Sequence, residues 1–353
     1  MGSVVRIRSE DLKDFCKAVL QKMDVPLPNA EVVSRALVDA DLRGLGTHGA
    51  VRLALYAQLF REGLINPRPE IRVISESSSH ILLDNDYGLG FLGSVQAMDL
   101  CMRIAQREGI AMAGVRNSSH FGAAGYYALM AAEQNLVGFA TSNSYPVMAP
   151  PDSVTPTHGN NPFAFAFPGG GKFPIVIDMA TSVVSQGKIK QYGSEGRPIP
   201  LGWAYDREGK PTQDPRALFL LAPFGEGGYK GYGLALTMDV LAGVLTGSFF
   251  ARNFVSGPGS RGCGHFFLAF DPQRFMPLHE FRKRMDEMIG QMKGARSPKE
   301  DRGEIYHPGE RGFLRKNKWI QEGIPMLSSA IQQLDQLADG MNLLRVRRTA
   351  DSL

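Results

Sequence analysis

Residues 81–94 read I-L-L-D-N-D-Y-G-L-G-F-L-G-S, and within them Gly88, Gly90 and Gly93 form the pattern G-x-G-x-x-G. The apolar run before the glycines predicts a strand, and residues 94–100 after them predict a helix. A strand, three glycines and a helix follow one another in the same order in a dinucleotide-binding turn, where backbone N–H groups at the helix start contact a pyrophosphate. The fold depends on whether this stretch is such a turn or a tight connection that binds nothing.

Two features of the stretch argue against a dinucleotide-binding turn of the Rossmann type. Asp84 and Asp86 place negative charge where the pyrophosphate would lie. The next predicted strand, residues 111–115, is followed by Arg116 and Asn117, without the acid that binds the ribose of NAD. The pattern is also a weak signal in a chain with 40 glycines among 353 residues. We therefore expect the glycines to serve a tight strand-to-helix connection.

The chain around this stretch changes from helical to β-rich patterning and back. Helical spacing marks the first 65 residues, with Ser9 and Asn29 as expected N-caps, and returns at residues 280–292 and 324–344. After the Pro-rich break at residues 66–69, strands are predicted at residues 71–74, 81–83, 111–115, 137–141, 163–167 and 175–177. We expect a mixed α/β fold in which residues 71–282 form an α/β domain, inserted into a helical domain built from residues 1–70 and 283–353.

Composition and charge indicate a folded protein without a nucleic-acid-binding or membrane-spanning part. Apolar residues make up 43% of the chain and charged residues 21%, and the net charge of +4 is spread thinly. The apolar stretch at residues 232–250 contains Asp239 and three glycines, so we expect a buried helix and not a membrane span.

The cysteines bear on the compartment. Cys16, Cys101 and Cys263 are odd in number and far apart in sequence, which favours a reducing cytoplasm over a disulfide framework or a zinc site. The first residues also lack the apolar core of a signal peptide. We expect a cytoplasmic protein with no metal site.

Two short motifs contain candidate catalytic side chains. In R-G-L-G-T-H-G-A-V-R, residues 43–52, a helix that begins near Thr47 would place His48 and Arg52 on one face. The guanidinium can bind a carboxylate with two hydrogen bonds, and the imidazole can exchange a proton. A solvated Arg and a capping His are the alternative. His120 follows a predicted strand in a loop rich in Ser and Gly, where a ligand can approach closely.

Three further motifs offer groups that suit a cofactor. Ser144 closes T-S-N-S at a strand end, and Asp178 in I-D-M-A-T-S can orient a histidine or accept a hydrogen bond from a ribose hydroxyl. Lys230 lies among five glycines at residues 225–233, which suits a phosphate, although a flexible loop is the alternative. Taken singly, each is an ordinary strand end or loop, and none has the spacing of a P-loop.

Together with G-N-N-P at residues 159–162 and H-P-G-E at residues 307–310, these motifs resemble the malate/L-lactate dehydrogenase type 2 family. This family includes ureidoglycolate and sulfolactate dehydrogenases, diketogulonate reductase and piperideine-2-carboxylate reductase. The motifs occur in the family's order over nearly the whole chain. The resemblance implies a homodimeric oxidoreductase that uses NAD or NADP, with a non-Rossmann cofactor domain whose mixed or antiparallel sheet is inserted in the helical domain.

The resemblance also implies roles for single residues. His48 and Arg52 match the substrate side of the family's site, and His120 matches its second active-site histidine. Cofactor contacts are implied for His120, Ser144, Asp178, Met179, Ala180, Lys230, His307, Pro308, Gly309 and Glu310. Either histidine can be the proton donor, and we favour His48 oriented by Asp178. The chain departs from the family at Pro150-Pro151-Asp152-Ser153, where relatives commonly have a Trp-Gly-Gly-like turn, so the shape of this loop stays open.

The implied reaction is hydride transfer between NAD(P)H and the 2-carbon of a small 2-oxo or 2-hydroxy acid of the malate, lactate, ureidoglycolate or sulfolactate type. A histidinium within about 3 Å would protonate the alkoxide that forms, while Arg52 fixes the carboxylate. The alternatives are a cyclic imine reductase of the piperideine-2-carboxylate type and a non-catalytic relative that binds a metabolite. The sequence leaves the acid and the choice between NAD and NADP open, and Arg116 or Arg311 are candidates to meet a 2′-phosphate.

Overall fold

A seven-stranded mixed sheet forms the centre of the computed structural model, which describes residues 4–171, 173–254, 261–296 and 304–348. The strands lie in the order β2, β3, β4, β10, β5, β6, β7. Their bounds are Arg72–Glu76 for β2, His80–Asp84 for β3, Ile110–Ser118 for β4, Val137–Ser142 for β5, Phe163–Phe167 for β6, Ile175–Met179 for β7 and Cys263–Phe270 for β10. β3 and β4 run parallel through helix α4 (Gly90–Glu108), and the other neighbouring pairs are antiparallel. The predicted mixed α/β fold and the six predicted strands are confirmed.

The seventh strand, β10, is the element that the sequence pattern missed. It lies in the middle of the sheet, where Phe267 pairs with Ala113 of β4 and with Ala140 of β5. Most of its residues are buried because elements cover both faces of the sheet. A strand buried on both faces has no alternation of polar and apolar residues, so the usual period of two is absent from C-G-H-F-F-L-A-F.

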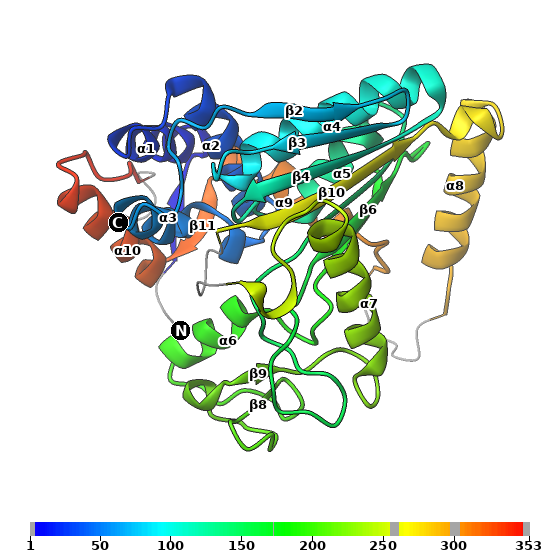
Figure 1. The fold of residues 1–353 in the computed structure, drawn as a ribbon. Coiled ribbons are helices and arrows are strands. Elements are labelled where there is room, and N and C mark those ends of the chain that lie inside the picture. Colours follow the sequence, from blue (N-terminus) through cyan, green and yellow to red (C-terminus); the bar gives the residue numbers. More distant parts are fainter. Residues whose placement is uncertain (1–3, 172, 255–260, 297–303, 349–353) are drawn as a thin grey trace.

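Helices lie on both faces of the sheet (Figure 1). α4 and α5 (Ala124–Glu133) pack on one face, where the core is rich in alanine. α7 (Tyr229–Asp239), continued by a π-helical turn at Val240–Val244, packs on the other face against Phe139 and Phe266. The prediction of a buried helix at residues 232–250 is wrong for the outer side of this segment. Leu236, Val240, Val244 and Leu245 there are 44–62% exposed.

Asp239 explains how an acid fits into that apolar segment. It faces inward, and its carboxylate accepts hydrogen bonds from Asn143 Nδ2 at 2.8 Å and from the Ala251 N–H at 2.9 Å. The segment is therefore amphipathic in an unusual sense, with its charge inside and its aliphatic side chains outside. Within the part of the chain that the structure describes, no helix is long and apolar enough to cross a membrane.

Segments near the start and the end of the described chain lie side by side. β1 (Val4–Ile7) pairs antiparallel with β11 (Ile324–Leu327), and one core joins residues from α1, α2, α3 and α10. These helices span Ser9–Lys22, Leu27–Leu42, Leu53–Arg61 and Ser328–Gly340. The expectation of a helix from residue 324 is wrong at its start, because pairing with β1 makes residues 324–327 a strand. Ser9 and Asn29 are not N-caps either, since Arg8 and Pro26 hold those positions.

Two smaller parts complete the molecule. α8 (Leu278–Lys293) lies at the end of the sheet away from α1 and α10 (Figure 1), where Arg282 donates a hydrogen bond to Asn135. The predicted domain boundary at residue 283 falls inside this helix, and the domain limits stay predictions. α6 (Gln186–Ser194) and the hairpin of β8 (Ala204–Tyr205) and β9 (Leu220–Leu221) share a small core of their own.

Candidate active site

The glycine-rich stretch of residues 84–94 connects β3 to α4 and packs against the loop that carries His120. The N–H of Gly90 donates to the carbonyl of His120 at 3.2 Å, and Ser119 Oγ donates to the carbonyl of Gly88 at 3.0 Å. A Cβ on Gly90 would lie 2.3 Å from the carbonyl oxygen of Ser119, so only glycine permits this approach. The N–H groups of Tyr87 and Gly88 also bond to protein carbonyls. The stretch therefore positions a histidine, and its amides are engaged within the protein.

The Thr47–Arg52 segment is not the start of an α-helix, so this prediction is wrong. Two 3₁₀ turns, Gly46–His48 and Ala50–Arg52, precede α3, which begins at Leu53. The buried Asp41 carboxylate causes the break, because it accepts a hydrogen bond from the Ala50 N–H at 2.8 Å and occupies the space where a Cβ on Gly49 would lie.

The same turns bring the predicted substrate-side residues together by another geometry. Arg52 Nε donates to the Thr47 carbonyl at 2.5 Å, which folds its side chain back toward His48. Thr47 Oγ1 in turn lies 3.2 Å from His48 Nδ1. Among the described residues, Arg52 has no ion-pair partner. A positive charge without a counterion favours binding of an anion.

The structure brings His48 and His120 together. Their ring centroids are 5.8 Å apart with planes at 21°. Tyr56, fully buried on α3, places its hydroxyl 2.7 Å from Nδ1 of His120, and the Gly122 N–H points at the same nitrogen from 3.4 Å. Because an amide can only donate, Nδ1 is the acceptor, and the hydrogen-bond partners assign the proton of the neutral ring to Nε2.

Both histidines are held in the neutral form. Burial, aided by the Arg52 charge, lowers the pKa of His48 to about 4. Burial lowers the pKa of His120 well below its usual value, and Arg52 and His48 add to this effect. Desolvation and a nearby cation both disfavour the charged ring. The expectation that a histidinium protonates the alkoxide during reduction stays a prediction.

Asp178 lies at the end of β7, where Oδ2 accepts a hydrogen bond from the Gly125 N–H at 3.0 Å. The polar partner that the structure describes for His48 is Thr47, and Asp178 accepts a hydrogen bond from the start of α5. The orientation of His48 by Asp178 stays a prediction. Its carboxylate is accessible from a pocket of about 210 Å³ yet surrounded by protein atoms, and this desolvation raises its pKa to about 6. Met179 and Ala180 continue the same strand edge.

The H-P-G-E turn docks beside Asp178. The Pro308 carbonyl accepts a hydrogen bond from the Val176 N–H on β7, and Gly309, with φ of +88°, lines the same pocket as Asp178. Glu310 begins α9 (Glu310–Glu322) and accepts hydrogen bonds from the His307 N–H at 3.0 Å and from Lys293 Nζ at 2.5 Å. Glu310 therefore stabilises the turn, and His307 is buried beneath it.

The remaining motifs converge at the other side of β7. The Ser144 N–H donates to Asn161 Oδ1 at 3.0 Å, and the Thr181 N–H donates to the Asn160 carbonyl at 3.0 Å. The glycine-rich loop closes the group, since a Cβ on Gly231 would lie 2.5 Å from the Thr181 carbonyl oxygen. Lys230, next to that glycine, is exposed, with Nζ 5.8 Å from the Tyr229 ring centroid.

Comparison with known proteins decides the family. Residues 7–335 match the family model described as malate/L-lactate dehydrogenase. The chain belongs to the malate/L-lactate dehydrogenase family. It is 41% identical over 344 residues to a malate dehydrogenase of Pyrococcus abyssi (95% of this chain, 94% of that protein). It is 34% identical over 341 residues to an L-sulfolactate dehydrogenase of Methanocaldococcus jannaschii (96% and 97%). The solved structure of malate dehydrogenase from Entamoeba histolytica superposes with a TM-score of 0.91 at 29% identity, covering 97% of this chain and 99% of that one.

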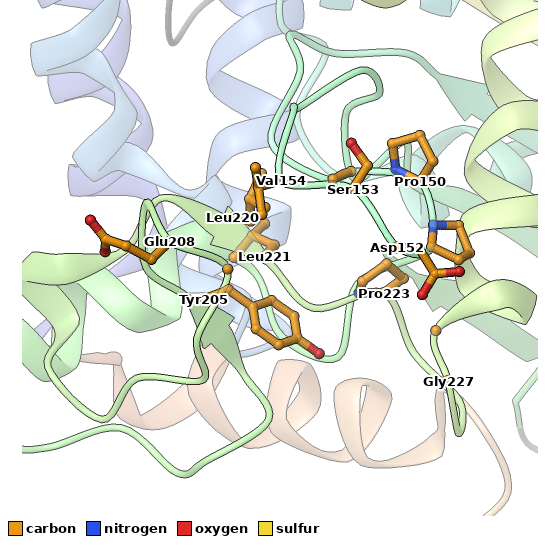
Figure 2. Close-up of a pocket in the computed structure, with 14 residues that line it drawn as sticks. Pro150, Asp152, Ser153, Val154, Tyr205, Glu208, Leu220, Leu221, Pro223 and Gly227 are labelled. Carbon is orange, nitrogen blue, oxygen red and sulfur yellow. The ribbon is translucent and has the colours of Figure 1, made fainter.

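In this member of the malate/L-lactate dehydrogenase family, the unusual Pro150–Ser153 loop borders a second cavity of about 290 Å³ (Figure 2). Asp152 lies near Pro223 and Gly227, whereas Glu208, in the loop that joins β8 to β9, lies at the opposite side of the view (Figure 2). The loop is therefore adjacent to the glycine-rich segment that precedes Lys230.

Sequence reasoning missed three polar side chains of this dehydrogenase site. Tyr56 bonds to His120, and the Tyr145 hydroxyl bonds to Gln186 at the start of α6. α6 lies against the Thr47 turn, since a Cβ on Gly187 would be 3.2 Å from Thr47 Cβ. Tyr56 carried a weak signal, because it follows Arg52 by four residues on one helical face.

Proposed function

We propose that this chain catalyses reversible hydride transfer between a nicotinamide cofactor and the 2-carbon of a small 2-hydroxy acid of the malate, lactate, sulfolactate or ureidoglycolate type. The observation that carries the proposal is the Arg52 guanidinium, which lacks an ion-pair partner among the described residues and lies beside two neutral histidines. A guanidinium binds a carboxylate with two parallel hydrogen bonds, and a neutral imidazole accepts the proton of the adjacent hydroxyl.

The histidines provide the proton acceptor. In the oxidation direction, a histidine that is neutral at pH 7 receives the proton of the 2-hydroxyl group. This is His48, or His120 in the tautomer whose proton lies on Nδ1 and is donated to the Tyr56 hydroxyl. A substrate carboxylate on Arg52 screens the cation that helps to lower the pKa of both rings, so substrate binding stabilises the imidazolium that forms. Tyr56 and the Gly122 N–H contact Nδ1 of His120 and place the ring proton on Nε2, so His120 in this tautomer donates a hydrogen bond to the substrate oxygen and does not accept the hydroxyl proton there.

The cofactor is proposed to lie along β7 and not at the Gly88–Gly93 stretch, as expected for a non-Rossmann domain. A bound nicotinamide supplies or accepts the hydride. Its binding residues are proposed to be His120, Ser144, Asp178, Met179, Ala180, Lys230 and the turn at His307, Pro308 and Gly309. Three observations support this placement. The Asp178 carboxylate can accept hydrogen bonds from hydroxyls, the exposed Lys230 can bind a phosphate, and Gly309 lines the same pocket as Asp178. Glu310 is proposed to hold the turn, because both its oxygens are engaged.

The assembly is proposed to be a homodimer. The exposed aliphatic side chains of α7 and its π-helical turn, Leu236, Val240, Val244 and Leu245, form an apolar surface, and such surfaces mark association sites. We also propose two domains: a helical domain of residues 1–70 and 283–353, and an inserted α/β domain of residues 71–282. The three free, buried cysteines suit the expected cytoplasm.

The test is a panel of 2-oxo acids, 2-hydroxy acids and cyclic imines assayed with both nicotinamide cofactors. We expect turnover of at least one carboxylic acid pair, with loss of most turnover in His48→Ala and His120→Ala and a raised KM in Arg52→Ala. Turnover of a cyclic imine alone would favour an imine reductase. Thermal stabilisation by a cofactor without turnover of any compound would indicate a non-catalytic relative, and near-normal kinetics in all three variants would refute the site.

A further inference from the structure

The pocket beside Asp178 is lined by apolar side chains and by two arginines. It lies between α2, the start of α5, β7 and the start of α9. Ala40, Tyr126 and Val176 form its apolar lining, which suits a flat aromatic base. Arg43 and Arg315 also line the pocket, and these two cations differ in the partners that they already have within the protein.

Arg43 already has partners within the protein. Its Nε donates to Asp39 Oδ2 at 2.6 Å, and its guanidinium lies 4.5 Å from the Phe313 ring centroid. The other oxygen of Asp39 accepts from Lys316 Nζ at 2.5 Å. An acid near the 2′-hydroxyl of an NAD ribose usually accepts its hydrogen bond, but both oxygens of Asp39 are engaged with cations. Asp178, which lines the same pocket, is the acid left for the ribose 3′-hydroxyl.

Arg315 is uncommitted. Among the residues that the structure describes, it has neither a hydrogen-bond nor an ion-pair partner. Its side chain lies flat against Gly44, where φ is +80° and a Cβ would be 2.8 Å from Nη1. Glycine at residue 44 thus leaves room for a guanidinium at the rim of the pocket, with N–H donors that suit a phosphate.

We propose that this pocket holds the adenosine end of the cofactor and that Arg315 binds its 2′-phosphate, so that the protein prefers NADP(H) to NAD(H). This inference rests on the proposed function, which places the cofactor at Asp178 and the His307 turn. Arg315 takes the role that the sequence suggested for Arg116 or Arg311, which is to bind the 2′-phosphate. Arg116 is paired with Asp84 at 3.1 Å, and Arg311 lies over the Tyr306 ring at 4.9 Å.

The experiment measures binding without turnover. NADPH and NADH are titrated by their fluorescence, and 2′,5′-ADP and 5′-AMP by calorimetry, against wild type, Arg315→Gln and the control Lys318→Gln. Lys318 is an exposed cation on the same helix that does not line the pocket. We expect wild type to bind NADPH and 2′,5′-ADP at least about tenfold more tightly than their unphosphorylated counterparts, as one charge-assisted contact allows.

In Arg315→Gln, the affinity for NADPH and 2′,5′-ADP should fall about tenfold or more while that for NADH and 5′-AMP stays within about threefold. Lys318→Gln should leave all four unchanged. An equal loss for NADH and NADPH would place the pyrophosphate on Arg315 and overturn the proposal, as would an unchanged Arg315→Gln or a wild type that prefers NADH. If wild type bound neither dinucleotide, the proposed function itself would fail, whereas equal binding of both overturns only the role of Arg315.

Discussion

Removal of the Tyr56 hydroxyl tests whether its hydrogen bond to Nδ1 holds the His120 ring in its orientation and tautomer. In Tyr56→Phe the ring can keep its edge contact with Phe91, at 6.1 Å between centroids, so the change is confined to one hydrogen bond. His120 Nδ1 then retains only the long contact from the Gly122 N–H at 3.4 Å. Loss of a buried hydrogen bond that leaves its partner poorly satisfied costs about 1–3 kcal/mol of unfolding free energy.

The free energy of this hydrogen bond also limits how far kcat can fall. If the hydroxyl holds His120 in the Nε2–H form and in its orientation, its loss lowers kcat by about 5- to 150-fold, which is 1–3 kcal/mol expressed as a rate. KM for the acid should stay nearly constant, because Arg52 is bound to Thr47 and not to Tyr56. The assay is steady-state kinetics with the preferred acid, with thermal unfolding to show that the variant is folded.

A double-mutant cycle supplies the control for Tyr56. In a His120→Ala background, Tyr56→Phe should cause no further loss of kcat, because its partner is absent. A folded Tyr56→Phe enzyme with kcat within about twofold of wild type would refute the reasoning. So would an additional full loss in the His120→Ala background, which would mean that Tyr56 acts on something other than His120.

Three further expectations follow from named contacts. The pKa of His48 is lowered to about 4, so its neutral base form persists at every pH above that value. If His48 is the base, kcat/KM for oxidation should stay high down to about pH 5. A fall in kcat/KM with an apparent pKa near 6.5 would contradict this. Gly90→Ala should lower both Tm and kcat, because its Cβ would lie 2.3 Å from the Ser119 carbonyl and displace the His120 loop; unchanged kcat in a folded variant would exclude that coupling. Leu245→Asp, at a side chain 62% exposed, should convert a dimer to a monomer in light scattering, and a dimer that persists would remove this surface from the interface.

The sequence predicted the strands of the sheet wherever apolar runs lie between turn residues. Residues 163–167 are an example, since the predicted and observed bounds of β6 agree. It failed at β10, where burial on both faces erases alternation, and at residues 324–327, where pairing with β1 overrides a helical spacing. Both failures come from partners far away in the chain, which local patterning does not encode.

The candidate site was predictable as a set of residues but not as a geometry. His48 and Arg52 do lie together, yet through two 3₁₀ turns that depend on the buried Asp41 and not through one helical face. The sequence also does not reveal that the Gly125 N–H donates to the carboxylate of Asp178, and the role favoured for Asp178, orientation of His48, stays a prediction. Such choices among competing hydrogen-bond partners are made by tertiary packing.

The charge on Arg52 links substrate recognition to proton transfer. Without an anion, Arg52 acts with burial to keep His48 and His120 neutral, so the site carries one positive charge and a neutral proton acceptor, His48. A carboxylate that binds Arg52 cancels this charge and raises the proton affinity of the histidine at the moment when a hydroxyl proton must leave. A 2-hydroxy compound without the carboxylate would lose both the contact and this rise in basicity. Its kcat should therefore fall together with its affinity, whereas a site in which Arg52 served binding alone would lose affinity only.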